Sequence, residues 1–72
     1  MKTYYFDFQD GVPLRDTRGM ELENASVAIE HCKRLAALTR EKQQPGREDL
    51  MIVVTDESGR EIHREPVYTP AT

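Results

Sequence analysis

The stretch "DLMIVVTD", residues 49–56, is the least polar part of the chain and decides how the rest must fold. A strand with one face in water alternates apolar and polar residues. This stretch is apolar on both faces, with two sets of alternate residues: Leu50, Ile52 and Val54 on one side, Met51 and Val53 on the other. We therefore expect residues 49–55 to form a central strand that needs cover on both of its faces.

A second strand is predicted at residues 3–9, "TYYFDFQ", where aromatic residues recur with period two. Such alternation is typical of a strand with one buried face. We expect the buried face to carry Tyr4, Phe6 and Phe8, and the opposite face to carry Tyr5, Asp7 and Gln9.

Turn residues and prolines set the other strands. Turn signals stand at "DG" (residues 10–11), "DTRG" (residues 16–19) and "DESG" (residues 56–59). They leave a short strand over residues 12–16 and a final strand over residues 60–68. Pro13 and Pro66 cannot donate to a ladder, so both strands belong at sheet edges. The predicted sheet is therefore four-stranded and antiparallel, with the order 2-1-3-4.

One amphipathic helix is expected between the second and third strands. Asn24 is a suitable N-cap, and "QQPG", residues 43–46, ends the helix. Apolar residues recur at the spacing of one helical face: Ala25, Ala28, Ile29, Cys32, Leu35 and Ala36. The predicted fold is a two-layer ββαββ domain of the α+β class, with this helix on one face of the sheet.

The composition favours a single soluble domain spanning residues 1–72. The net charge of −3 makes nucleic acid an unexpected partner, since such binding depends largely on Lys and Arg. Cys32 is the single cysteine, so no internal disulfide framework exists, which suits a reducing compartment. No apolar run is long enough to span a membrane, and the N-terminus lacks the apolar region of a signal peptide. We expect a cytoplasmic protein.

The second face of the sheet is the predicted functional surface. With one helix to cover one face, Tyr5, Met51 and Val53 are left on the other, with Asp7 beside them and His63 facing either this patch or solvent. Apolar patches with a polar rim often mark association surfaces. At about 25 cal/mol per Å², burying a few hundred Å² would contribute several kcal/mol before the cost of association. We expect a homodimer, with a heterologous protein partner or an uncovered, wet face as the alternatives.

Residues that could carry chemistry have simpler explanations in this sequence. Asp7, Asp10 and Asp16 could bind a hard cation, but Asp10 and Asp16 also occupy positions where turns favour Asp. Cys32 lies on the apolar face of the helix, where a free thiol packs as a small hydrophobe. A nucleophilic pair would need His63 to approach it. We expect no catalysis and no cofactor.

The chain resembles a family of small uncharacterised bacterial domains. The resemblance lies in the order of motifs: "YYFDFQDG", then Asp16, Gly19 and Leu22 in an Asp-x-x-Gly-x-x-Leu segment, an Ala-rich helix, and a hairpin with Asp56 and Gly59. It covers nearly the whole chain and implies no function, because the family has none assigned.

A second resemblance concerns architecture alone. The order of hairpin, acidic-Gly segment, helix and strand is similar to that of HicB-type antitoxins, although "RDTRG", residues 15–19, stands where those proteins have Pro-Asp-x-Pro-Gly. It implies a regulatory module that binds a small enzyme. Our expectation is a non-catalytic protein-association domain, with this antitoxin-like module as the alternative.

Overall fold

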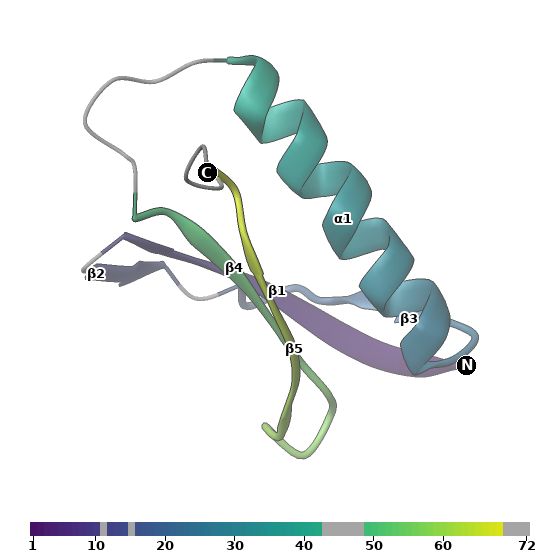
Figure 1. The fold of residues 1–72 in the computed structure, drawn as a ribbon. Helices are drawn as coiled ribbons and strands as arrows, with labels where there is room; N and C mark the ends of the chain where they lie inside the picture. The colour runs from purple at the N-terminus through teal and green to yellow at the C-terminus, as the bar shows by residue number, and fades with distance from the viewer. Residues whose placement is uncertain (11, 15, 43–48, 69–72) are drawn as a thin grey trace.

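The computed structural model describes residues 1–10, 12–14, 16–42 and 49–68. In chain order the elements are β1 (Lys2–Asp10), β2 (Val12–Leu14), β3 (Met20–Leu22), α1 (Ala25–Glu41), β4 (Met51–Thr55) and β5 (Glu61–Pro66) (Figure 1). The antiparallel order β2-β1-β4-β5, with α1 on one face, confirms the predicted α+β fold and its strand order. Among the described residues, no helix combines the length and apolarity needed to cross a bilayer.

The sequence analysis missed β3, which continues the edge strand begun by β2. Both pair antiparallel with β1, but Phe8 is opposite Leu14 whereas Tyr4 is opposite Met20. Four steps along β1 therefore correspond to six along its partner, so the edge strand contains two extra residues. Extra residues of this kind form a bulge that interrupts the ladder. Here the bulge is the turn at residues 16–19, and the predicted strand over residues 12–16 ends at Leu14.

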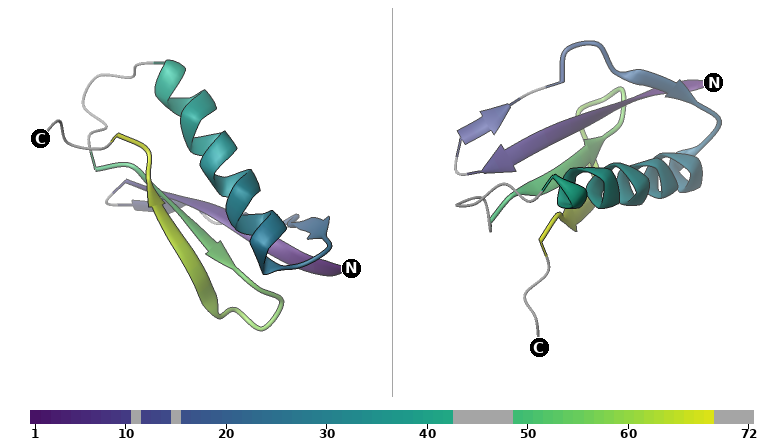
Figure 2. Two further views of the ribbon diagram at one scale, coloured as in Figure 1. Left: turned by 45° about the vertical axis from the view of Figure 1, so that its right-hand side comes forward. Right: turned by 90° about the horizontal axis from the view of Figure 1, so that it is seen from above.

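The helix begins where predicted, because the Asn24 side chain accepts a hydrogen bond from the backbone N–H of Val27 at 3.0 Å. Its fully buried residues are small: Ala28, Cys32 and Ala36. Small residues on this face let α1 approach the sheet closely, and it packs mainly on β4 and β5 (Figure 2). The predicted stop at residues 43–46 and the glycine of the 10–11 turn lie outside the described residues.

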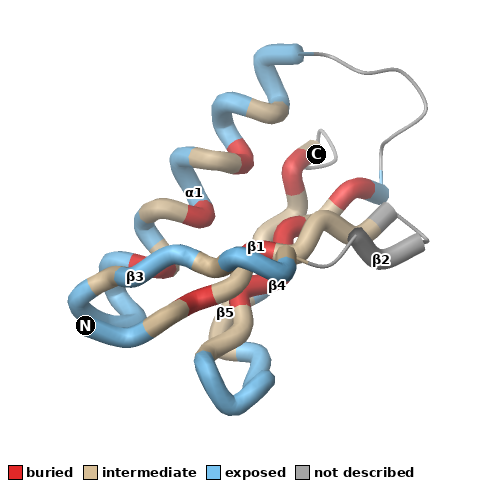
Figure 3. The backbone as a smooth tube through the Cα atoms, turned by 180° about the vertical axis from the view of Figure 1, so that it is seen from behind, coloured by how far each residue is buried: buried red, intermediate tan, exposed pale blue. Residues whose placement is uncertain are grey.

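The core lies between α1 and the sheet (Figure 3). It contains most of the predicted set, with Phe8 and Ile62 only partly buried at its margin: Tyr4, Phe6, Leu50, Ile52 and Val54. Val67, which the sequence analysis did not place in the core, is fully buried as well. Its backbone N–H donates to Leu50 at 3.0 Å and its carbonyl accepts from Arg40 Nε at 2.6 Å. These two bonds hold the chain beneath the end of α1.

Candidate functional site

The sheet surface opposite α1, which we call the far face, carries most of the predicted association residues. Residues directly opposite one another in an antiparallel ladder share a face. The register therefore arranges this face in rows that run from β1 through β4 to β5: Tyr5–Thr55–Glu61, Asp7–Val53–Arg64 and Gln9–Met51–Pro66. Tyr5, Asp7, Met51 and Val53 lie on this face, as the sequence analysis expected.

Cover on the far face comes in part from the chain itself. Val53, at its centre, is only 3% exposed, and Tyr5 and Met51 are half-buried. The ring of Tyr5 lies close to the backbone of Gly19, since a Cβ atom there would stand 2.9 Å from Tyr5 Cε1. The apolar surface left open is therefore smaller than the sequence pattern suggested, and Val53 contributes almost none of it.

His63 does not belong to the far face. It lies opposite Val54, a core residue beneath the helix, so its side chain is on the helix side of the sheet. Its Nε2 is 2.8 Å from Glu65 Oε1, and the two side chains are about equally exposed. A register shift between Val54 and Thr55 changes the alternation of β5. Counting residues by two along the sequence could not anticipate that change.

The predicted acids near the first hairpin accept backbone hydrogen bonds. Asp16 Oδ2 accepts from Phe6 at 3.2 Å, and Asp16 Oδ1 accepts from Arg18 at 3.0 Å and Gly19 at 3.2 Å. The backbone N–H of Asp16 in turn donates to Asp7 Oδ1 at 2.8 Å. In the part of the chain that the structure describes, no three His, Cys, Asp or Glu residues form a group that could hold a metal ion. The side chain of Asp10 lies outside that part.

These hydrogen bonds fix the charge state of Asp16. Partial burial alone would raise the pKa of its carboxyl group, but the N–H groups of Gly19, Phe6 and Arg18, together with the Arg18 charge, outweigh that effect. The net result is a pKa below the usual value for Asp, so Asp16 is a carboxylate at neutral pH. It acts as a structural acceptor, because it takes the place that a strand carbonyl would have beside Phe6.

Cys32 is chemically quiet. Burial, with a smaller contribution from the nearby charge of Glu65, raises the pKa of its thiol to about 11. A thiol with such a pKa is almost entirely protonated at neutral pH and is a poor nucleophile. Glu65 also holds the ring of His63. The neighbourhood of Cys32 therefore opposes thiolate formation.

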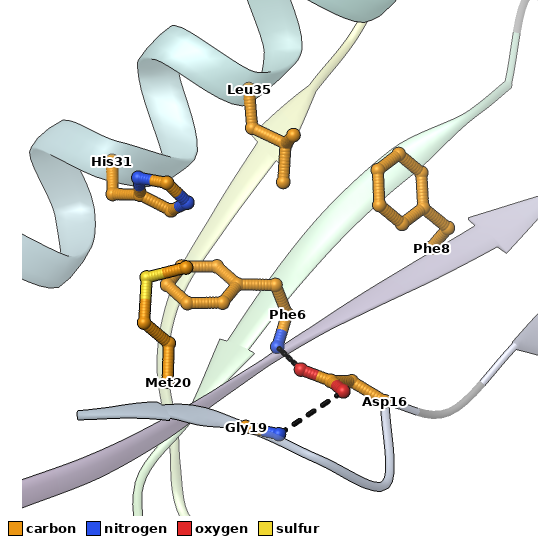
Figure 4. Close-up of a pocket in the computed structure, with 7 residues that line it drawn as sticks. All are labelled: Phe6, Phe8, Asp16, Gly19, Met20, His31 and Leu35. Carbon is orange, nitrogen blue, oxygen red and sulfur yellow. Dashed lines mark hydrogen bonds between the residues drawn. The ribbon is translucent and has the colours of Figure 1, made fainter.

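A groove is the most open feature on the helix side of the sheet. It has a volume of about 450 Å³ and is lined by side chains from β1, β3 and α1 together with the turn at residues 16–19 (Figure 4). These are Phe6, Phe8, Asp16, Gly19, Met20, His31 and Leu35. The rings of Phe6 and His31 meet edge to face, with centroids 5.1 Å apart. The lining is predominantly apolar and aromatic, as in many binding sites.

The sequence analysis missed this groove because it assigned Phe6 and Phe8 to the core beneath a helix that covered the whole face. In the structure, α1 is seated over β4 and β5, so the β1 side of the same face is left beside the helix rather than under it. The signal was the run of small residues Ala28, Cys32 and Ala36, which seats α1 closely on one part of the sheet. Met20, at 40% exposure, forms the outer margin of the groove.

Comparison with known proteins assigns the chain to a family. The model of the family described as "Domain of unknown function (DUF6894)" matches residues 3–68. The chain therefore belongs to that family of small domains. No curated protein and no solved structure matches the sequence. The family assignment confirms the resemblance seen in the motifs and leaves function to be inferred from the surfaces described above.

Proposed function

We propose that this domain is a non-catalytic protein-association module that forms homodimers through its far face. The observation that carries the proposal is the central row of that face, in which Asp7 and Arg64 flank Val53 on opposite sides. A surface with opposite charges on either side of a central residue can be complementary to itself. Such self-complementarity is the requirement for a two-fold symmetric contact.

The row fixes the orientation of the two copies. Sheets that pack face to face lie about 10 Å apart with their strands roughly aligned. If the two-fold axis runs along β4, β1 of one copy lies over β5 of the other, so each Asp7 meets Arg64 of the second copy. An axis perpendicular to the strands would instead stack Asp7 on Asp7. Like charges in direct opposition disfavour that arrangement.

Apolar contact in this dimer comes from Tyr5 and Met51, since Val53 is already shielded. The charge pairs add specificity more than affinity. Arg64 is also held by Glu61, with Nη2 2.9 Å from Oε1 in an exposed pair that lowers the pKa of Glu61. Because exposed pairs contribute little, Arg64 can turn toward a second copy at small cost. We expect a dimer in the micromolar range rather than a permanent one.

Sedimentation equilibrium at high micromolar concentration tests the proposal. The wild-type chain should approach twice its monomer mass of 8.3 kDa. Met51→Lys should shift the chain toward monomer because it places a charge in the apolar part of the contact. Val53→Asp is unsuitable, since burying a charge at a 3% exposed position would destabilise the monomer itself.

Arg64→Glu tests the orientation, because it places like charges opposite each other and should weaken the dimer. Adding Asp7→Asn should restore part of the association, while leaving Oδ1 to accept from the backbone of Asp16. Lys33→Glu, on the exposed surface of α1, is the control with the same change in net charge. A wild-type monomer at these concentrations contradicts the proposal.

A further inference from the structure

We infer that the groove between α1 and β1 receives an amphipathic helix from a different protein, with apolar residues facing the groove and acidic residues at its margins. The site lies on the opposite side of the sheet from the proposed dimer contact and does not depend on it. The inference rests on the width of the uncovered sheet, the apolar wall of α1 and the charges beside the groove.

The uncovered part of the sheet has the width of a helix. Strands are spaced about 4.8 Å apart and a helix with its side chains is about 10 Å wide, so one helix covers about two strands. Since α1 packs mainly on β4 and β5, the adjoining half of the helix-side face, on β1 and its edge strand, has no helix above it. Its floor carries Phe6 and Phe8, and Met20 stands at its outer margin (Figure 4).

The wall that α1 presents to the groove is apolar over several turns. His31 and Leu35 line the groove, and the same helical stripe continues at Val27 and Leu38, which are 36% and 54% exposed. Residues spaced by three and four lie on one side of a helix, so these four form a continuous ridge. A long ridge beside an aromatic floor suits a partner helix that lies along α1, with anchors at the same spacing.

The charges beside the groove select an acidic partner. Arg34 lies between His31 and Leu38 on the groove side of α1, and Arg18 lies in the turn between Asp16 and Gly19, both of which line the groove. Both arginines are exposed, and neither guanidinium forms an ion pair with a described residue. The carboxylate of Asp16 already accepts from backbone N–H groups. The available charge at the margins is therefore positive, although the chain as a whole is acidic.

A second copy of this chain fits the groove poorly. Its only helix in the described residues uses Ala28, Cys32 and Ala36 against its own sheet. If its Val27–Leu38 ridge met the ridge of the first copy, the side turned toward the groove floor would carry Glu30, Arg34 and Glu41. Charged residues against Phe6 and Phe8 would have no partners there. A heterologous helix avoids this conflict.

Titration with model peptides, followed by the backbone amide signals of the ¹⁵N-labelled full chain, tests the inference. The probe is a capped helical peptide of roughly 18 residues, about five turns, with Leu along one face and Glu and Ala elsewhere. Matched peptides replace every Glu by Lys, or every Leu by Ser. The acidic peptide should bind saturably and shift the amide signals of Phe6, Met20, His31 and Leu35. The Lys and Ser peptides should bind far more weakly.

Protein variants assign the contacts. Arg34→Glu should weaken the acidic peptide about threefold, and Arg18→Glu with Arg34→Glu about tenfold. Leu38→Glu should also weaken binding through the apolar ridge. Lys33→Glu is the control, because it makes the same charge change at an exposed position on the other side of α1. Equal binding of the Lys peptide, or equal effects of Lys33→Glu and Arg34→Glu, would overturn the inference. So would groove signals that move with protein concentration alone, which would identify a second copy as the occupant.

Discussion

Two turns of this molecule share the pattern Asp-x-x-Gly but make different contacts. Gly19 has a φ of 72° and Gly59 a φ of 85°, a region that residues with a Cβ atom rarely adopt. Asp16 and Asp56 both accept hydrogen bonds from backbone N–H groups within their own turns. Local geometry alone does not distinguish the turns, so the difference lies in what surrounds them.

The first turn is part of the sheet. Asp16 accepts from Phe6 of β1 at the point where the edge strand is interrupted between β2 and β3. Gly19 is packed so closely that an added Cβ would stand 2.6 Å from Thr3 Cγ2 and 3.2 Å from the Tyr4 carbonyl oxygen. The same turn forms one wall of the groove. It therefore joins the edge of the sheet to the proposed binding site.

The second turn is self-contained. Asp56 Oδ1 accepts from the backbone of Ser58 and Arg60 and from the Ser58 hydroxyl. An added Cβ at Gly59 would meet nothing within 4 Å. This turn closes the β4–β5 hairpin without support from the rest of the chain. The comparison teaches that one sequence pattern can specify either a local turn or a junction between elements.

The largest expected difference is between Gly19→Ala and Gly59→Ala. Both variants meet the cost of a positive φ, about 1–2 kcal/mol, but only Gly19→Ala adds a clash with β1. We expect Gly19→Ala to lower the free energy of unfolding by about 3 kcal/mol or more, and Gly59→Ala by about 1 kcal/mol. Urea denaturation of the two variants measures the difference. Equal losses would show that the first turn is as independent as the second.

A smaller contrast is expected between Asp16→Asn and Asp56→Asn. An amide at position 16 keeps one acceptor oxygen but presents an NH₂ group to the N–H of Phe6, which loses its acceptor. Leaving a partly buried donor unpaired costs about 1–3 kcal/mol. Asp56→Asn keeps an oxygen for its exposed partners, so its loss should be clearly smaller. Denaturation midpoints at neutral pH test this order, and a reversed order would contradict our assignment of Asp16.

The smallest contrast concerns acid. Because the folded-state pKa of Asp16 lies below its unfolded-state value, ionised Asp16 stabilises the fold fully above the unfolded pKa, about 3.9. This contribution disappears as the pH falls through the folded-state pKa. Asp16→Asn should therefore be less stable at pH 7 but lose less on acidification to pH 3 than the wild type. Identical slopes of unfolding free energy against pH in the two proteins would show that Asp16 has no such role.

The sheet order could be predicted because it depends on residues with strong backbone preferences. Pro13 and Pro66 assigned the edges, and the two-sided apolar strand at residues 49–55 assigned the centre. The β3 strand was missed because "MEL" is short and its pairing depends on a free stretch of β1, which only the folded chain reveals. The face of His63 was missed because the register shift in β5 is a property of strand pairing.

The candidate site was harder to predict for a related reason. The far-face residues followed from alternation alone, but the burial of Val53 depends on neighbours from other strands. The groove depends on where α1 lies across the sheet, which no periodicity in the helix specifies. In the same way, Asp16 could be assigned to a turn from its sequence context. Its bond to Phe6 required the position of β1.

Hydrogen exchange of the Phe6 amide tests the central claim, that the Asp16 carboxylate completes the edge of β1, most directly. We predict that this amide is protected in the wild type. In Asp16→Asn its exchange should accelerate more than that of the Val54 amide in the core, whereas Asp56→Asn should leave the ratio of the two rates unchanged. An unprotected Phe6 amide in the wild type, or an unchanged ratio in Asp16→Asn, would contradict the account.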